Sequence, residues 1–306
     1  MVRRTALLVL ALVLAFALPA EARTIHVHKG QSIQAAVDRA RAGDRILVHP
    51  GTYREEGKPC PAISAQTCAV AIKKHGIKLI GLSRKGRPVT LKARNGQDAG
   101  IEVGKPRTGD CLTDPSKRIH GSLVKGFTVR DFDDFGVFLL CVDHWRITRV
   151  RAIDNGEYGT FPRHTTIGRL DHSFASGSND TGHYIGQSSR ARVDHNVAKD
   201  NVSGFELENT TQSRADHNLA VGNTGGFLSF ALPGLDVKVN SGNRIDHNRA
   251  LRNNRKNTCL EPEDAVCDVP PGTGILLVAA DTNRIDANKV SGNKSLGIGM
   301  ANYCVA

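Results

Sequence analysis

The stretch from Asp171 to Asn218 repeats one short phrase three times and decides the fold. It reads Asp171-His172-Ser173, then Asp194-His195-Asn196, then Asp216-His217-Asn218, with starts 23 and 22 residues apart. The phrase returns as Asp246-His247-Asn248 and, weakened, as Asp286-Ala287-Asn288. A unit of this length cannot bury its own apolar face and must stack on its neighbours. The fixed period therefore predicts a solenoid.

A glycine opens a short apolar strand once in each period. The intervals between these glycines are 23, 23, 22, 22, 48 and 23 residues, and the glycines are Gly136, Gly159, Gly182, Gly204, Gly226, Gly274 and Gly297. Side chains alternate along a strand, so the first and third residues after each glycine should face inward and the second outward. Recurring asparagines, such as Asn196, Asn218 and Asn248, should form a structural ladder along the stack.

The first residues have the pattern of a signal peptide. Arg3 and Arg4 precede an apolar run from Ala6 to Leu18, and Ala20-Glu21-Ala22 is typical of a cleavage site. We expect a leader at 1–22 and one mature domain at 23–306, with regular repeats from about residue 123. No later stretch is apolar enough to cross a bilayer. The protein should be secreted, periplasmic or held at the cell surface, with no membrane span after cleavage.

The net charge of the chain indicates what kind of molecule it binds. The chain has a net charge of +11 at pH 7, which in an exported protein favours an acidic polysaccharide over nucleic acid. A general preference for arginine would explain the charge equally well. Disulfides are expected in an oxidising compartment. The pairs suggested are Cys60 with Cys68, Cys111 with Cys141, and Cys259 with Cys267, although the sequence leaves the connectivity open.

The chain's two ends differ. A strand at Thr24–His28 is followed by a helix predicted from Ile33 to about Arg41, with Ser32 as its cap, and this helix would cover the open end of a solenoid. No such cap is visible near Ala306, and Cys304 is left unpaired. We therefore expect a protein partner or a second copy to cover the C-terminal end.

The opening of the mature chain resembles a known family. The run Gly30-Gln31-Ser32-Ile33-Gln34-Ala35-Ala36-Val37, with Gly43-Asp44 and Pro50-Gly51-Thr52-Tyr53, is similar to the start of pectin-lyase-like right-handed parallel β-helix proteins. This resemblance implies an all-β, right-handed parallel β-helix with an N-terminal capping helix. Those relatives are exported carbohydrate-active enzymes and surface proteins, and many functions share the scaffold.

The outward face of the glycine-led strands is the predicted site. We expect catalytic roles for Arg163, His164, Tyr184, Glu206 and Glu208, and substrate binding by Asp180, Gln187, Asn209 and Phe230. Lyase or epimerase chemistry on a uronate needs a base, a cation beside the sugar carboxylate, and a proton donor. Glu206 and Glu208 would make a poor opposed pair for glycoside hydrolysis, because they lie two apart on one strand. An ordinary solvated face is the alternative.

Two insertions interrupt the later repeats, one around Leu232-Pro233-Gly234-Leu235 and one from Cys259 to Pro271. Loops from neighbouring coils often wall a groove, although they could also be decoration.

Two further resemblances bear on the reaction. The run Tyr158-Gly159-Thr160-Phe161-Pro162-Arg163-His164 is similar in frame to the Asp-Pro-His-Asp motif of periplasmic mannuronan C5-epimerases, but only the proline matches. Runs Gly182–Ser188 and Gly204–Asn209 more closely resemble a family of exported bacterial parallel β-helix repeat proteins, which implies no settled function.

The repeated histidines suggest a different class of function. His172, His195, His217 and His247 would form one column, and a related exported β-helix protein serves copper-site assembly. A straight column offers at most two ligands per ion, so we assign no metal site. We expect no cofactor, with calcium as an alternative. The sequence thus favours binding, and lyase- or epimerase-type processing, of an acidic polysaccharide. The alternative is a non-catalytic scaffold that assists a metalloprotein.

Overall fold

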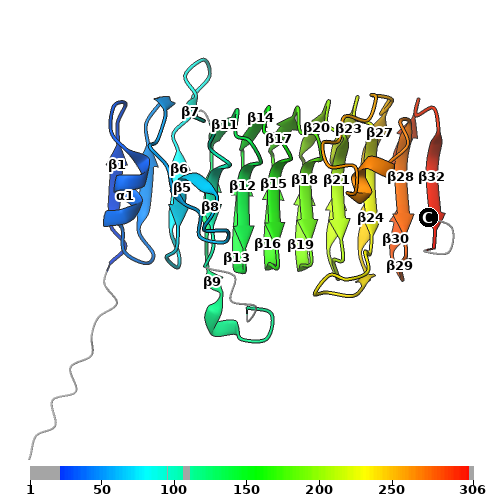
Figure 1. The fold of residues 1–306 in the computed structure, drawn as a ribbon, viewed down its shortest axis with the longest axis horizontal. Coiled ribbons are helices and arrows are strands. Elements are labelled where there is room, and N and C mark those ends of the chain that lie inside the picture. Colours follow the sequence, from blue (N-terminus) through cyan, green and yellow to red (C-terminus); the bar gives the residue numbers. More distant parts are fainter. Residues whose placement is uncertain (1–20, 95, 106–110, 303–306) are drawn as a thin grey trace, which may run out of the picture.

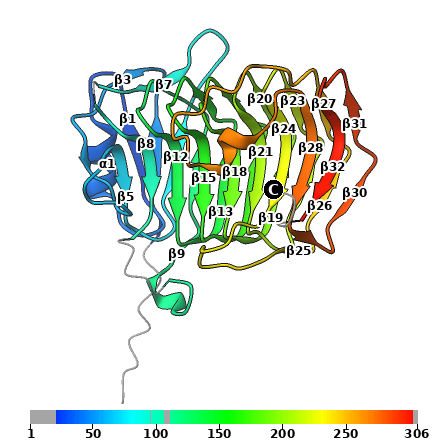
Figure 2. The same cartoon turned by 45° about the vertical axis from the view of Figure 1, so that its right-hand side comes forward.

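The chain winds through three long parallel sheets that run the length of the molecule (Figures 1 and 2). The computed structural model describes residues 21–94, 96–105 and 111–302. Residues 1–20 of the expected leader, and Cys304, lie outside the described residues. Within the described part, no helix has the length and apolar character needed to span a membrane.

The first sheet contains β1 (Thr24–Val27), β2 (Arg45–Val48), β6 (Lys78–Gly81), β10 (Leu123–Lys125), β13 (Val142–Thr148), β16 (Thr166–Asp171), β19 (Ser189–Asp194), β22 (Arg214–Asp216), β26 (Arg244–Asp246) and β30 (Arg284–Asp286), with β9 (Ile119–His120) beside β13. The second contains β3 (Gly51–Tyr53), β7 (Val89–Lys92), β11 (Phe127–Arg130), β14 (Arg151–Ile153), β17 (Phe174–Ser176), β20 (Val197–Lys199), β23 (Leu219–Val221), β27 (Arg249–Leu251) and β31 (Lys289–Ser291).

The third sheet contains β4 (Lys58–Pro59), β5 (Thr67–Ile72), β8 (Ala99–Val103), β12 (Phe135–Leu140), β15 (Tyr158–Arg163), β18 (Thr181–Gly186), β21 (Ser203–Glu208), β24 (Gly225–Phe230), β28 (Thr273–Val278) and β32 (Leu296–Ala301). The remaining elements are α1 (Ile33–Arg39), the 3-10 helices η1 (Pro115–Lys117) and η2 (Ala265–Asp268), and the short pair β25 (Asn240–Ser241) and β29 (Ala280–Asp281).

Each coil contributes one strand to each sheet, as β16, β17 and β18 do. Among the described strands every pairing is parallel except that of β4 with β5. The repeated phrase stays in register, since Asp171 lies opposite Asp194 and Asp194 opposite Asp216. The predicted solenoid is therefore confirmed as a parallel β-helix.

The interior is filled by the side chains that alternation predicts to face inward. Val137, Phe205 and Ile275 each follow a repeat glycine, and all three are buried in one continuous core. His183 is a polar exception among these apolar side chains. It lies in the same interior at 1% exposure, and its Nδ1 atom is 3.0 Å from Thr160 Oγ1. Burial lowers the pKa of His183 to about 3, so its imidazole is neutral in the folded protein.

The repeat glycines are required by close stacking of the coils. A Cβ atom placed on Gly159 would lie 2.4 Å from the carbonyl oxygen of Gly182 in the next coil, and one on Gly226 would lie 2.4 Å from that of Gly274. Neither backbone can move without breaking the parallel pairing, so only glycine fits.

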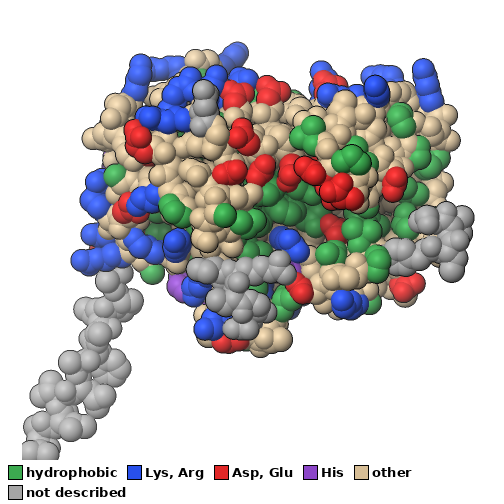
Figure 3. Space-filling view, in the orientation of Figure 1, with side chains coloured by type: hydrophobic (Ala, Val, Ile, Leu, Met, Phe, Trp, Pro, Cys, Tyr) green, Lys and Arg blue, Asp and Glu red, His purple; other side chains and the backbone are tan. Residues whose placement is uncertain are grey.

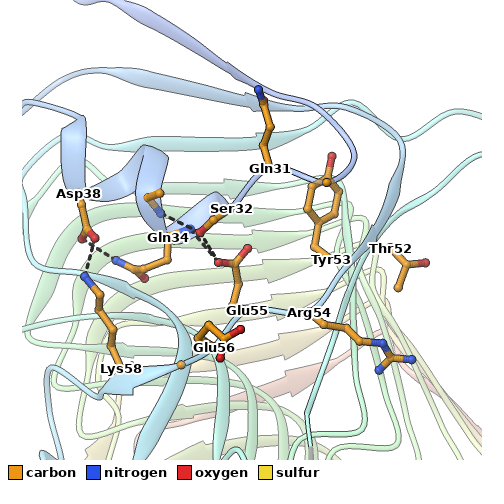
Figure 4. A pocket seen from close by; sticks show the side chains of 13 residues that line it. Gln31, Ser32, Gln34, Asp38, Thr52, Tyr53, Arg54, Glu55, Glu56 and Lys58 are labelled. Carbon is orange, nitrogen blue, oxygen red and sulfur yellow. Dashed lines mark hydrogen bonds and ion pairs between the residues drawn. The ribbon is translucent and has the colours of Figure 1, made fainter.

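The predicted N-terminal helix forms beside the first coil. Ser32 Oγ accepts a hydrogen bond from the Ala35 amide, as expected of the cap residue, and donates to Glu55 (2.5 Å), whose carboxylate also accepts from the Ile33 amide (Figure 4). Ile33, Ala36 and Val37 extend the main core. The helix stops at Arg39, two residues earlier than predicted, because Ala40 is extended. Its role as a cover for the stack stays a prediction.

Asparagine ladders connect the turns of successive coils. Asn218 Oδ1 accepts from both the backbone and side-chain nitrogens of Asn196, at 2.9 and 3.0 Å, while Asn218 Nδ2 donates to Asn248 and to the Val193 carbonyl. Asn201, Asn223 and Asn253 form a second ladder in the same way. These bonds satisfy turn backbone groups that the core would otherwise leave unpaired.

A ladder of Arg–Asp ion pairs also connects successive coils. Arg192 binds Asp216 of the next coil through two hydrogen bonds of 3.1 and 3.0 Å, and Arg214 binds Asp246 at 2.8 and 2.6 Å. The aspartate side chains are fully buried. Paired geometry of this kind gives strong, directional bonds between coils.

The three suggested disulfides are confirmed, and they join Cys60 to Cys68, Cys111 to Cys141, and Cys259 to Cys267. Each one closes or attaches a segment that leaves the regular stack.

Substitution Asn218→Ala should lower the free energy of unfolding by at least about 2 kcal/mol, because it leaves several buried polar groups without partners. Lys199→Ala is the control. Its ammonium lies on an exposed surface, 3.4 Å from Asp200, and its loss should change stability by less than about 0.5 kcal/mol. Urea unfolding followed by circular dichroism measures both, and equal stability of the two variants would contradict the ladder's role.

Candidate functional site

The outward face of the third sheet changes character along the stack. Phe138 and Phe161 occupy this face on successive coils, followed in register by Tyr184, Glu206 and Leu228. The face therefore passes from aromatic through acidic to aliphatic side chains. Figure 3 shows acidic side chains gathered beside a hydrophobic band in the middle of this side of the molecule.

One insertion folds back over this face, and the other is held at the ends of β18 and β21 through Gln187 and Asn209. The one that carries η2 lies across β24 and β28 (Figure 1) and packs Val266 and Val269 against Leu228. Together with Leu232 of the first insertion, these residues line a cavity of about 620 Å³. The insertions therefore wall a single hollow next to the acidic stretch.

The cover changes the setting of the predicted site. Tyr184 and Glu206 are each only 3% exposed, so this face is not the open polar strip that strand alternation alone indicates. Arg163 and Glu208 are partly exposed and lie at the edge of the buried region. Tyr184 and Glu206 are thus shielded from bulk water, while Arg163 and Glu208 are partly open to it.

Tyr184, Glu208 and Arg163 form the centre of the site. The Tyr184 hydroxyl donates a hydrogen bond to Glu208 on the next coil. The charge of Arg163 acts on both groups and opposes the rise in their pKa values. Gly186 makes the pair possible, because a Cβ there would lie 1.9 Å from the tyrosine oxygen.

Three carboxyl groups in and beside this centre have pKa values above their ordinary range. Burial, and then the charge of Asp180, raise the pKa of Glu206 well above its ordinary value. Burial raises the pKa of Asp180 to about 7, although a hydrogen bond from Tyr158 opposes the rise. Burial also raises the pKa of Glu208. Glu206 therefore holds its proton more tightly than an exposed glutamate does, and its Oε1 atom has no hydrogen-bond partner among the described residues.

The two tyrosines stay protonated. Burial and nearby carboxylates raise the pKa of Tyr184, and likewise of Tyr158, well above 10. A phenol in this state donates protons or hydrogen bonds and does not act as a base. Of the three groups at the centre, only the Glu208 carboxylate can accept a proton.

His164 lies apart from this centre. It is buried at the end of β15, its Nε2 is 3.4 Å from Asp236, and Arg118 donates to its carbonyl at 2.5 Å. It lines a separate cavity of about 430 Å³ with Cys111 and Leu112. The structure does not bring His164 together with Tyr184 and Glu206, as the sequence had suggested.

The predicted substrate-binding residues divide into two groups. Gln187 accepts hydrogen bonds from the Asp236 and Val237 amides, and Asn209 bonds the backbone of Leu232 and Val237. Both therefore hold the first insertion in place. Phe230 instead lines the 620 Å³ cavity, and Asp180 belongs to the acidic group. Substrate binding by these residues stays a prediction.

Sequence inspection missed Tyr158, Glu157 and Asp264. Burial raises the pKa of Glu157 to about 7, helped by the charges of Asp134, Asp180 and Asp264. Tyr158 carried a usable signal, since it directly precedes the repeat glycine Gly159. Asp264 lies in an insertion that follows no repeat, so nothing in the pattern could place it.

The histidine column forms, but its side chains do not converge. The rings of His172, His195 and His217 are stacked nearly parallel, with centroids 5.2 Å apart. His195 Nδ1 and His217 Nδ1 each bond the aspartate that precedes them, at 2.8 and 2.9 Å. The column is thus part of the ladder of charged turns.

Asp180→Asn should flatten the dependence of stability on pH. The folded pKa of about 7 exceeds the ordinary value, so Asp180 stabilises the fold at low pH, and this contribution is lost as the pH rises from about 4 to 7. In that pH window the unfolding free energy of Asp180→Asn should rise relative to that of the wild type by about 1.4 kcal/mol per pH unit.

Measuring this difference cancels the opposite contribution of His183, whose lowered pKa is common to both proteins. Asp281→Asn, at an exposed site, is the control. Parallel curves for wild type and Asp180→Asn between pH 5 and 8 would show that Asp180 ionises normally.

Comparison with known proteins agrees with the fold. The A-module of mannuronan C-5 epimerase AlgE6 from Azotobacter vinelandii has a TM-score of 0.67 at 19% identity, covering 88% of this chain and 70% of the epimerase chain. The corresponding module of AlgE4 from the same organism has a TM-score of 0.57 at 17% identity, covering 84% and 71%. A Geobacillus virus E2 protein, ORF18, gives 0.51 at 14% identity, covering 86% and 48%.

No curated protein matches the chain by sequence. The family described as "Right handed beta helix region" matches residues 135–305, which is more than half of the chain. The stacked coils, the parallel register and this match lead to one conclusion: the chain belongs to the right-handed β-helix family.

Proposed function

We propose that this protein processes a uronic-acid-containing polysaccharide at the Tyr184–Glu208–Arg163 centre, by β-elimination or by epimerisation at C5. The observation that carries the proposal is the hydrogen bond from a protonated tyrosine to a carboxylate, beside a cation, in a buried group of acids. Perturbed acids that meet in a hollow are typical of catalytic sites. The fold shared with the epimerase A-modules supports the substrate class by analogy only.

The electrostatics of the site suit an anionic sugar. Burial raises the pKa values of Glu206 and Asp180, and this favours their neutral forms and reduces the negative charge that an anionic sugar would meet. Arg163 then provides the positive charge opposite the sugar carboxylate, and Glu206 can donate a hydrogen bond to it. Both interactions strengthen as negative charge develops on that carboxylate in the transition state.

The proton transfers follow from the states of the two central groups. Glu208, as carboxylate, takes the proton from C5, and the electrons of the C–H bond pass into the sugar carboxylate. In elimination the C4–O bond then breaks, Tyr184 protonates the leaving oxygen, and a C4–C5 double bond forms. In epimerisation Tyr184 instead gives its proton to C5 from the opposite face, and the proton held by Glu208 passes back to Tyr184 through their hydrogen bond. Phe230, in the adjacent cavity, would pack against a neighbouring sugar ring.

A second function is binding without turnover. It is favoured by the low exposure of Tyr184 and Glu206 beneath the insertions, and by the use of Gln187 and Asn209 to hold one insertion in place. On this proposal the protein is an exported scaffold. Either function places it in a secreted, periplasmic or cell-surface location, which the three disulfides support.

The purified protein should act on at least one of alginate, pectate or a glycosaminoglycan. Ultraviolet absorbance of the unsaturated product reports elimination, and exchange of C5 protons with deuterated water reports epimerisation. Tyr184→Phe should lower kcat by about 100-fold or more, because it removes the proton donor, and Arg163→Gln should lower kcat/KM through loss of charge stabilisation.

Glu56→Gln is the matched control, because this exposed carboxylate follows β3 of an early coil and pairs only with Arg94 among the described ion pairs. It should retain wild-type activity. Turnover that survives in Tyr184→Phe and Arg163→Gln would move the reaction to another site. Polymer binding without turnover would favour the scaffold.

A further inference from the structure

We propose that His26, His28 and His49 form a binding site for a divalent transition-metal ion that prefers imidazole, such as Zn²⁺ or Cu²⁺, at the N-terminal end of the β-helix. This site is separate from the proposed catalytic centre, and the proposal does not depend on it. The sequence pattern had pointed to the histidine column and to calcium as possible metal chemistry, and had led to no metal-site assignment.

Strand register brings the three side chains together. β1 pairs with β2 so that Val27 lies opposite Val48, and both valines face the core. His26 and His28 flank Val27 and face outward by alternation. His28 and His49 follow the last registered pair, and the His49 amide donates to the Val27 carbonyl at 2.8 Å. Two histidines from one coil thus meet a third from the next.

The imidazole nitrogens converge. One ring nitrogen from each of the three residues lies within 4.8 Å of the other two. His26 Nδ1 and His49 Nε2 are 3.0 Å apart, and the rings of His28 and His49 have centroids 4.0 Å apart. Zn–N bonds of about 2.0–2.1 Å at tetrahedral angles place ligand nitrogens roughly 3.3 Å apart. Small side-chain rotations would therefore bring the three nitrogens onto one ion.

The backbone of the site is anchored while its solvent side is open. The buried Tyr53 hydroxyl donates to the His49 carbonyl at 2.7 Å, and the Gln31 side chain accepts from the His28 amide at 2.8 Å. His26 and His28 are exposed, so water can take the fourth ligand position.

The other groupings in the described part of the chain lack this chemistry. Two further sets bring three donor atoms within 4.8 Å, but each includes cysteines that are joined in a disulfide. In the histidine column, neighbouring rings are parallel at 5.2 Å and Nδ1 bonds an aspartate. The N-terminal cluster therefore stands out by convergence and by donor type.

Titration of the metal-free protein with ZnCl₂ in a calorimeter tests the site. We expect one equivalent of Zn²⁺ to bind per chain and to raise the unfolding temperature, because the ion binds only the folded arrangement. His26→Gln combined with His28→Gln should weaken binding by at least about 100-fold, since loss of even an indirect partner of a metal ligand costs about 10- to 100-fold.

His195→Gln combined with His217→Gln removes two histidines from the column and is the matched control, expected to bind like wild type. If the first double variant is poorly folded, His26→Gln alone, at an exposed position, replaces it, and Co²⁺ absorption bands reporting histidine ligands are compared in wild type and variant. Absence of stoichiometric binding by folded wild type would overturn the proposal. So would Zn²⁺ binding that the column variant loses and the His26/His28 variant keeps.

Discussion

The structure depends on hydrogen bonds between buried polar side chains at the same turn of successive coils. Asn196, Asn218 and Asn248 each complete the turn of a neighbour, and Arg192 and Arg214 do the same for buried aspartates. Because these turns are completed in part by groups of the neighbouring coil, the coils are favoured in a single register. The hydrophobic interior supplies the driving force for stacking, while these ladders select how the coils align.

That alignment is also what builds the candidate site. A fixed register places Tyr184 beside Glu206, and brings Tyr184 to Glu208 of the following coil. Asp180, Glu206 and Glu208 are buried in this row, and the loss of solvation raises their pKa values. The proposed chemistry thus depends on the regular register of the coils and on the two insertions that interrupt the repeats.

Much of the scaffold could be predicted because its signals are local or periodic. The glycine and Asp-His-Asn periods predicted the coils, alternation predicted inward residues such as Val137 and Phe205, and Ser32 marked the start of α1. The partners of the aspartates were missed. Arg192 and Asp216 are 24 residues apart, so their pairing follows from stacking and is not visible within one repeat.

The coils, their inward and outward faces and the candidate residues Tyr184, Glu206 and Glu208 could be predicted from the sequence alone, since each of these follows from spacing along the chain. Only the tertiary structure decided which outward residues are buried, and that His164 lies away from Tyr184. It alone brought His26 and His28 to His49. The insertions do not follow the repeat pattern, and side-chain contacts between coils depend on the register of the strands. The environment of a side chain is therefore fixed only when the coils have stacked.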